Sequence, residues 1–117
     1  GEIDIMEQNG WNKNELYGYF HYANSQGVYN SHGDVTNINN TSGNYHVYSM
    51  EWTKDKIRIL VDNKEFVSLN NTADVPFDNP HYLLLNIAIG GNLGGDIDPS
   101  FSQDRMEVDY VRVFQKE

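Results

Sequence analysis

Three acidic residues at the start of the chain have the spacing of a catalytic carboxylate cluster. Glu2, Asp4 and Glu7 lie within the first seven residues, and from Glu2 onward acidic and apolar residues alternate. This alternation is the period of a β-strand with one solvent face and one core face. Strict alternation would turn Glu7 toward the core. We therefore expect a β-bulge, with one extra residue at Met6, that returns Glu7 to the face of the other two acids.

The spacing also indicates how far apart the two glutamates lie. With one residue absorbed by the bulge, Glu2 and Glu7 are about four strand steps apart, or roughly 13 Å between Cα atoms at about 3.3 Å per step. Side chains that lean toward each other would hold their carboxyls roughly 5 Å apart. A retaining glycosidase needs about 5–5.5 Å and an inverting one about 6.5–9.5 Å. The estimate favours retention and leaves inversion open. On the motif alone, the alternative is a solvated edge strand.

Composition and charge restrict the class of protein. The 117 residues correspond to one domain. The formal charge of −9 argues against a nucleic-acid partner and is compatible with a neutral polysaccharide. Because the chain has no cysteine, it has neither disulfides nor a thiolate metal site. It also lacks an apolar run of about 18 residues, so we expect no membrane span.

The next part of the chain reads as a strand followed by a long loop. The alternation in 15–23 predicts a strand with Leu16, Gly18, Phe20 and Tyr22 on one face, and Tyr17, Tyr19 and His21 on the other. If this strand pairs with the first, His21 reaches the carboxylate face. Residues 25–43 are poor in apolar residues, which predicts a loop that forms one wall of a groove.

The remaining segments predict further strands. Residues 44–69 read as a meander of strands with turns at 53–56 and 63–64, and we expect Trp52 in the core and His46 in a packing or hydrogen-bonding role. Residues 81–89 predict a strand between two sheets. Asn86 is a polar residue within that apolar run, so its amide must be hydrogen-bonded. Residues 106–115 alternate cleanly and predict the last strand.

These motifs resemble a known family. The stretch E-I-D-I-M-E resembles the ExDxxE signature of glycoside hydrolase family 16, in the bulged form of laminarinase-like endo-β-1,3-glucanases. The family's later segments follow in order: Gly18-Tyr19-Phe20-His21-Tyr22, the block from Tyr45 to Asp62, L-x-L-N-x-A-x-G-G-N at 83–92, and V-D-Y-V-R-V-F-Q at 108–115. Two positions depart from the family pattern: Leu93 stands where many relatives carry a Trp that stacks on sugar, and Phe114 stands where the last segment usually has Tyr.

The resemblance implies an all-β fold. The expected architecture is a concanavalin-like β-jelly-roll sandwich of two antiparallel sheets with a concave substrate groove. Residues 1–117 match only the C-terminal half of the family's catalytic domain, so the N-terminal strands are expected to be absent. We therefore expect a second chain or segment that completes the sandwich.

The resemblance also implies roles for individual residues. Glu2 is the expected nucleophile, Glu7 the general acid/base, and Asp4 the residue between them. The expected substrate-binding residues are Trp11, His21 and Asn86. For Trp11 a loop anchor on the sheet is an equal alternative, and for Asn86 a structural amide is the alternative. Asp109 matches a residue that often ligates a structural calcium, and no cofactor is expected in the chemistry.

The implied function is retaining endo-hydrolysis of a β-1,3-glucan or a mixed-linkage β-1,3-1,4-glucan, by an enzyme that is secreted, periplasmic or bound at the cell surface. One alternative is an enzyme of the same family that acts on another polymer of the agar or carrageenan type. The second alternative is a carbohydrate-binding sandwich without turnover, and the intact Glu2, Asp4 and Glu7 argue against it.

Overall fold

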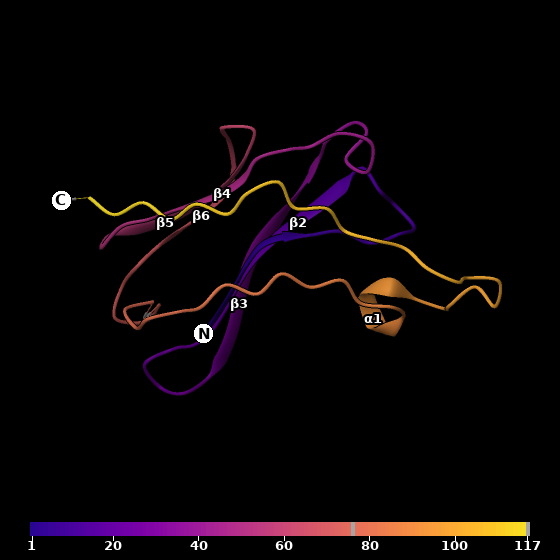
Figure 1. The fold of residues 1–117 in the computed structure, drawn as a ribbon. Coiled ribbons are helices and arrows are strands. Elements are labelled where there is room, and N and C mark those ends of the chain that lie inside the picture. The colour runs from indigo at the N-terminus through magenta and orange to yellow at the C-terminus, as the bar shows by residue number, and fades with distance from the viewer. Residues whose placement is uncertain (76, 117) are drawn as a thin grey trace. The chain divides into compact units, whose positions relative to one another are not determined.

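The computed structural model describes residues 1–75 and 77–116, and it divides into two compact units, Gly1–Tyr82 and Leu83–Glu117 (Figure 1). Each is described by itself. The first unit contains strands β1 (Glu2–Glu7), β2 (Glu15–Ala23), β3 (Tyr29–Asn37), β4 (Tyr48–Trp52), β5 (Lys56–Val61) and β6 (Lys64–Asn70). The second contains one short helix, α1 (Gly91–Gly94). Among the described residues no helix has the length and apolar character to cross a membrane.

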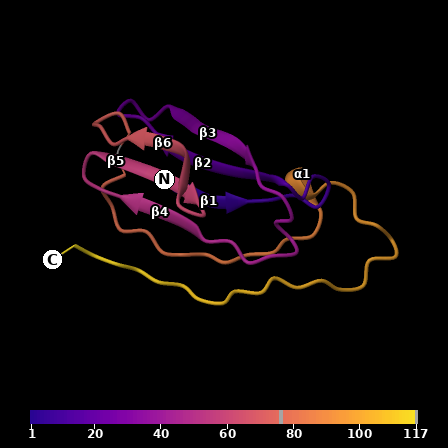
Figure 2. The ribbon, with the colours of Figure 1, turned by 90° about the horizontal axis from the view of Figure 1, so that it is seen from above.

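The first unit is a sandwich of two antiparallel sheets. One sheet has the order β1-β2-β3 and the other β4-β5-β6, so each is a meander of sequential strands. The sheets lie one above the other, with β1 against β4 and both β2 and β3 against β6 (Figure 2). The expected all-β fold with two antiparallel sheets is confirmed.

The core between the sheets explains why these strands form. It consists of five fully or nearly fully buried residues from both sheets and the segment after β6: Phe20, Ile57, Ile59, Val67 and Phe77. In β2 the buried residues alternate with partly exposed ones, as the sequence predicts. Ile3 and Ile5 pack against the same core from β1, so the strand that carries the acids is anchored by its apolar face.

The hairpin between β5 and β6 is closed by a tight turn. Asp62 and Asn63 both adopt positive φ, at 49° and 64°. Two successive residues of this kind form the type I′ turn, whose twist matches that of the flanking strands. Asp62 also accepts hydrogen bonds from His46 Nδ1 (2.7 Å) and the Val47 amide (3.0 Å). The hydrogen-bonding role predicted for His46 is thus confirmed.

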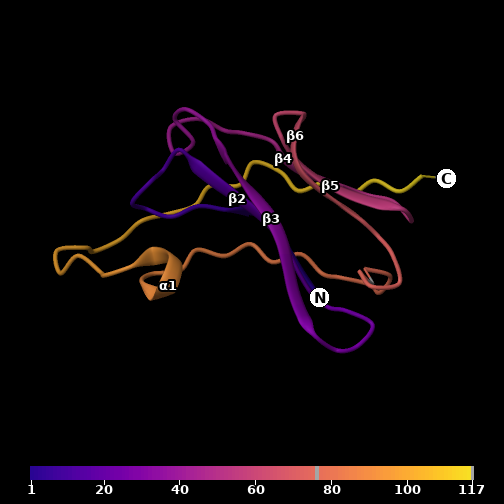
Figure 3. The same cartoon turned by 180° about the vertical axis from the view of Figure 1, so that it is seen from behind.

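The prediction of a long loop at 25–43 is wrong, because β3 occupies the centre of that segment. Every residue of β3 pairs with β2, from Tyr29 opposite Ala23 to Asn37 opposite Glu15 (Figure 3). β3 is the outer strand of its sheet in the described residues, and most of its side chains are exposed. Because such a strand needs little apolar surface, the periodicity that marks a strand is missing from its sequence.

The strands expected at 81–89 and 106–115 are also not formed. Both segments are extended and exposed, without ladder partners among the described residues. A strand needs a neighbouring strand to satisfy its N–H and C=O groups, and an apolar pattern does not provide one. Asn86 is consequently exposed, which disfavours the alternative of a buried structural amide.

Trp52 lies at the end of β4 and not in the core. It is 37% exposed, and its ring meets the edge of His81 at a centroid distance of 5.2 Å. The last two residues of β4 are exposed and the first three are partly buried, so burial in this strand ends before Trp52.

Candidate active site

The pairing of β1 with β2 sets the geometry of the acidic cluster. Glu2 lies opposite His21 and Asp4 opposite Tyr19. Between Asp4 and Glu7 the register shifts, so that Glu7 lies opposite Tyr17. Three steps along β1 therefore correspond to two steps along β2. This is the predicted β-bulge, and it places all three carboxylates on the face that points away from the core.

Asp4 is the electrostatic centre of the cluster. Its side chain is 16% exposed, and burial raises the pKa of its carboxyl to about 6. Burial is the largest cause of this rise. The charges of Glu7 and Glu2 and a side-chain hydrogen bond with Glu2 contribute to the same rise in pKa, while His21 opposes it. At about pH 6 and below, Asp4 can therefore carry a proton and donate it to Glu2 in a hydrogen bond.

His21 connects the acids to the aromatic side chains of the same face. Its Nε2 lies 3.2 Å from Asp4 Oδ2, and its Nδ1 lies 2.7 Å from the hydroxyl of Tyr29. The structure thus brings His21 to the carboxylate face, as its position in the sequence predicts.

Three rings form a row beside the carboxylates. Tyr19 stacks on His21 with centroids 5.9 Å apart, and His21 on Tyr29 with centroids 6.0 Å apart, each pair at 14° between planes. Gly33 of β3 lies under Tyr19, where a Cβ would overlap the ring and the carbonyl oxygen of Gly18. Sequence reasoning missed Tyr29 and Gly33, because both lie in the segment that was expected to be a loop.

Trp11 lies in the loop between β1 and β2. It is 71% exposed, which disfavours the alternative of a loop anchor tucked onto the sheet. Asn9 shapes this loop, because its Oδ1 accepts the amides of Trp11 at 3.1 Å and Asn12 at 2.8 Å. The loop therefore presents a large aromatic side chain to solvent.

The two remaining predicted site residues, Asn86 and Asp109, belong to the second unit and are exposed there. The residues present do not build a calcium site around Asp109, because the described ranges contain no group of three or more His, Asp or Glu side chains arranged so that it could hold a metal ion. Calcium prefers six to eight oxygen ligands. A calcium at Asp109 therefore stays a prediction.

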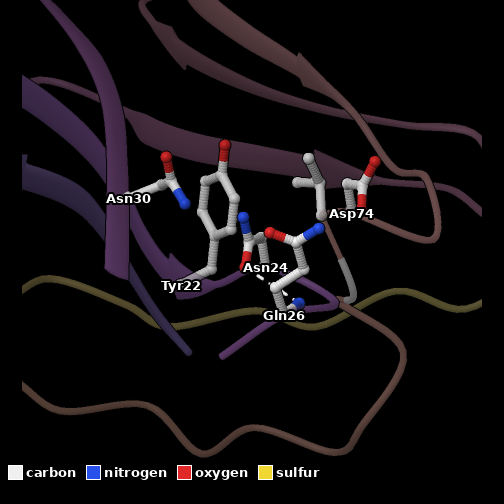
Figure 4. Close-up of a pocket in the computed structure, with 6 residues that line it drawn as sticks. Tyr22, Asn24, Gln26, Asn30 and Asp74 are labelled. Carbon is white, nitrogen blue, oxygen red and sulfur yellow. Dashed lines mark hydrogen bonds between the residues drawn. The ribbon is translucent and has the colours of Figure 1, made fainter. Parts of the chain in front are cut away.

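A separate hollow of about 260 Å³ lies at the end of the β2–β3 hairpin. Tyr22, Asn24, Gln26, Asn30 and Asp74 line it (Figure 4). Tyr22 follows His21 on β2 and so points to the opposite side of the sheet from the carboxylates. The oxygen of the Asn24 amide is bonded to the hairpin's own backbone, at Gln26 N and Val28 N. These contacts shape the turn and take no part in the acidic cluster.

The fold and the acidic face together define a class. A two-sheet β-sandwich with carboxylic acids aligned on one solvent face has the side chains that a glycosidase uses. The profile of the family described as glycosyl hydrolases family 16 matches residues 1–112, and the chain belongs to that family. The membership inferred from the motifs is confirmed.

Two curated relatives extend the comparison. The chain is 35% identical over 132 residues to Glucan endo-1,3-beta-glucosidase A1 of Niallia circulans, with 100% of this chain and 19% of the relative covered. It is 36% identical over 129 residues to Beta-glucanase of Rhodothermus marinus, with 98% and 44% covered. The chain thus spans less than half the length of either relative.

Solved structures show the same likeness. LamAcat from Zobellia galactanivorans superposes with a TM-score of 0.81 at 45% identity, covering 85% of this chain and 40% of that one. A LamA variant from the same bacterium, solved in complex with laminaritriose and laminaritetraose, gives the same values. The fold of the relatives is therefore shared over most of this chain.

Proposed function

We propose that the face formed by Glu2, Asp4 and Glu7 cleaves internal bonds of a β-1,3-glucan or a mixed-linkage β-1,3-1,4-glucan with retention of configuration. The observation that carries this proposal is the register shift in β1, which places the three acids on one solvent face. The names of the glucanase relatives support the choice of a glucan substrate. The LamA complex with laminari-oligosaccharides supports it as well.

The proposed reaction has two displacements. In the first, the Glu2 carboxylate forms a bond to the anomeric carbon while Glu7 gives its proton to the departing glycosidic oxygen. In the second, Glu7 takes a proton from water, the water oxygen attacks the anomeric carbon, and the bond to Glu2 breaks. The first step needs an ionised Glu2 and a protonated Glu7 on the same face. In the second step Glu2 is bonded to the sugar and Glu7 is ionised, so that it can take the proton of the water.

Asp4 is proposed to control the charge of Glu2. A protonated Asp4 can donate a hydrogen bond to Glu2, which stabilises the carboxylate before attack and lowers repulsion within the cluster. The raised pKa of Asp4, about 6, means that this proton is still available in mildly acidic solution.

The remaining roles are proposed from the resemblance of the sequence to the family. Trp11 and His21 bind the substrate from the loop and from β2, and Asn86 does so from the second unit. Asp109 contributes to a structural calcium together with ligands outside the described residues.

A polysaccharide is too large to enter a cell, so we also propose that the protein is secreted, periplasmic or held at the cell surface. A second chain or segment is proposed to pair with 81–89 and 106–115, whose edges are open.

The test is hydrolysis of laminarin and of mixed-linkage glucan by the protein and by Glu2→Ser. We expect reducing-sugar release by the unsubstituted protein and a loss of roughly 10³-fold or more in Glu2→Ser, because the nucleophile is gone. Glu51→Ser is the matched control: it makes the same change on β4, in the other sheet, and should leave turnover unchanged.

Two further measurements make the test specific. The anomer that forms first, followed by proton NMR, should keep the β configuration; an α product would contradict the double displacement. Binding of laminari-oligosaccharides should persist in Glu2→Ser. Binding without any hydrolysis by the unsubstituted protein would identify a carbohydrate-binding sandwich instead of an enzyme.

A further inference from the structure

His21 is held at both of its ring nitrogens by groups from two different strands. Asp4 of β1 meets Nε2 at 3.2 Å, and Tyr29 of β3 meets Nδ1 at 2.7 Å. The titratable groups on the same face of the sheet as this ring include the acids Glu2, Asp4 and Glu7 from β1, Tyr17 and Tyr19 from its own strand and Tyr29 from β3. A histidine bonded in this way has little freedom to rotate or to change its tautomer.

The chemistry of the two partners decides where the proton lies. An ionised carboxylate accepts hydrogen bonds and cannot donate one, so Nε2 must carry a hydrogen when it contacts ionised Asp4. In the neutral ring, Nδ1 is then bare and accepts a hydrogen bond. The Tyr29 hydroxyl can donate that bond, whereas a carbonyl or carboxylate at the same place could not.

We propose that Tyr29 is a positioning residue: by donating its hydroxyl to Nδ1 of His21, it keeps the His21 proton on Nε2, where it faces Asp4. The chain Tyr29–His21–Asp4 would then reach from the outer strand of the sheet to the acid between the two catalytic glutamates. The inference about the His21 tautomer does not depend on any enzymatic activity. The expected effect of Tyr29 on turnover rests on the proposed function.

The placement of Tyr29 fits a positioning role. It is the first residue of β3 and lies opposite Ala23, two pairs beyond the pair formed by His21 and Ser31 and on the same face of the sheet. Its ring lies within 14° of the plane of His21, yet the residue is 67% exposed. Because so little of the ring is buried, the hydroxyl contact is its most specific interaction with the site.

The first test reads the tautomer directly by ¹⁵N NMR of the imidazole nitrogens in the substrate-free protein near pH 8. A His21→Gln spectrum assigns the His21 signals among those of the four histidines. We expect a bare Nδ1 and a protonated Nε2. In Tyr29→Phe the two nitrogen shifts should move toward each other, as the second tautomer or a rotated ring becomes populated.

The matched control is Tyr19→Phe, which removes the hydroxyl from the other ring stacked on His21. In the described part of the chain the Tyr19 hydroxyl is not bonded to His21, so the His21 shifts should stay as in the unsubstituted protein. His21 shifts that are identical in Tyr29→Phe and in the unsubstituted protein would overturn the proposal.

The second test measures kcat and KM on laminarin. Tyr29→Phe should lower kcat roughly three- to tenfold, the range expected for one lost hydrogen bond, with KM within about twofold. A wild type that cleaves nothing, with the NMR change still present in Tyr29→Phe, would overturn the proposed function and leave the tautomer inference intact. Cleavage by the wild type with kcat and spectra unaltered in Tyr29→Phe would overturn the inference alone.

Discussion

At the scale of single residues, Asp4 combines a chemical role with a cost in stability. Its pKa in the folded protein, about 6, lies above the ordinary value of 3.8, so the folded state holds the Asp4 proton more tightly than the unfolded state does. The stability from this proton is fully present below the ordinary pKa and is lost as the pH rises through about 6. Above that pH the ionised Asp4 lowers the free energy of unfolding.

This predicts that Asp4→Asn is more stable than the unsubstituted protein in mild alkali. The amide cannot ionise, so near pH 8 we expect a gain of about 1–2 kcal/mol, less than the full pKa shift because solvent screens a half-buried carboxyl. Near pH 3 the gain should vanish. Urea unfolding at both pH values measures it, with Asp55→Asn in the exposed β4–β5 turn as the control. An equal gain at both pH values would attribute the effect to packing instead of charge.

At the scale of elements, the sequence is informative where the determinants are local. The pairing of β1 with β2 and the bulge before Glu7 follow from alternation within a few residues, and both are confirmed. β3 escapes prediction because its polar, exposed side chains carry no period. Residues 81–89 carry a strong apolar pattern and form no strand, because pairing depends on a neighbour that their own sequence does not contain. Tyr29 was missed as a site residue for the same reason as β3.

The packing of Tyr19 against Gly33 of β3 leaves no space for a side chain at position 33. Tyr19 of β2 covers Gly33, and a Cβ there would approach the ring and the Gly18 carbonyl to less than 3.0 Å. Gly33→Ala should therefore push Tyr19 away and lower the free energy of unfolding by about 1–3 kcal/mol. Gly10→Ala is the matched control, since a Cβ at Gly10 meets nothing within 4 Å. Thermal unfolding of both variants decides the matter: equal melting temperatures would mean that Tyr19 moves at no cost.

At the scale of the whole first unit, the two faces of the β1-β2-β3 sheet differ: one carries the acids and the other packs against the core. β1 turns its acids outward and packs Ile3 and Ile5 against the core, so the position of the carboxylates depends on the packing between the sheets. Phe77 holds that packing at one end. It is 1% exposed and meets the rings of Phe20 at 5.9 Å and Tyr22 at 5.8 Å, both edge-on. The segment after β6 thus closes the core beneath the sheet that carries the acids.

Phe77→Ala should consequently weaken both the fold and the site. Removing a fully buried aromatic ring costs about 3–5 kcal/mol, because the surrounding side chains cannot fill the cavity. Urea unfolding should show this loss, and hydrolysis should fall at temperatures where the variant is still folded, because β2 carries Phe20 on one face and His21 on the other. Tyr82→Ala, at a residue 82% exposed in the same unit, should change stability by no more than about 0.5 kcal/mol. A loss below about 1 kcal/mol in Phe77→Ala would mean that the sheets are held together without it, and the acidic face would then owe its geometry to the β1–β2 pairing alone.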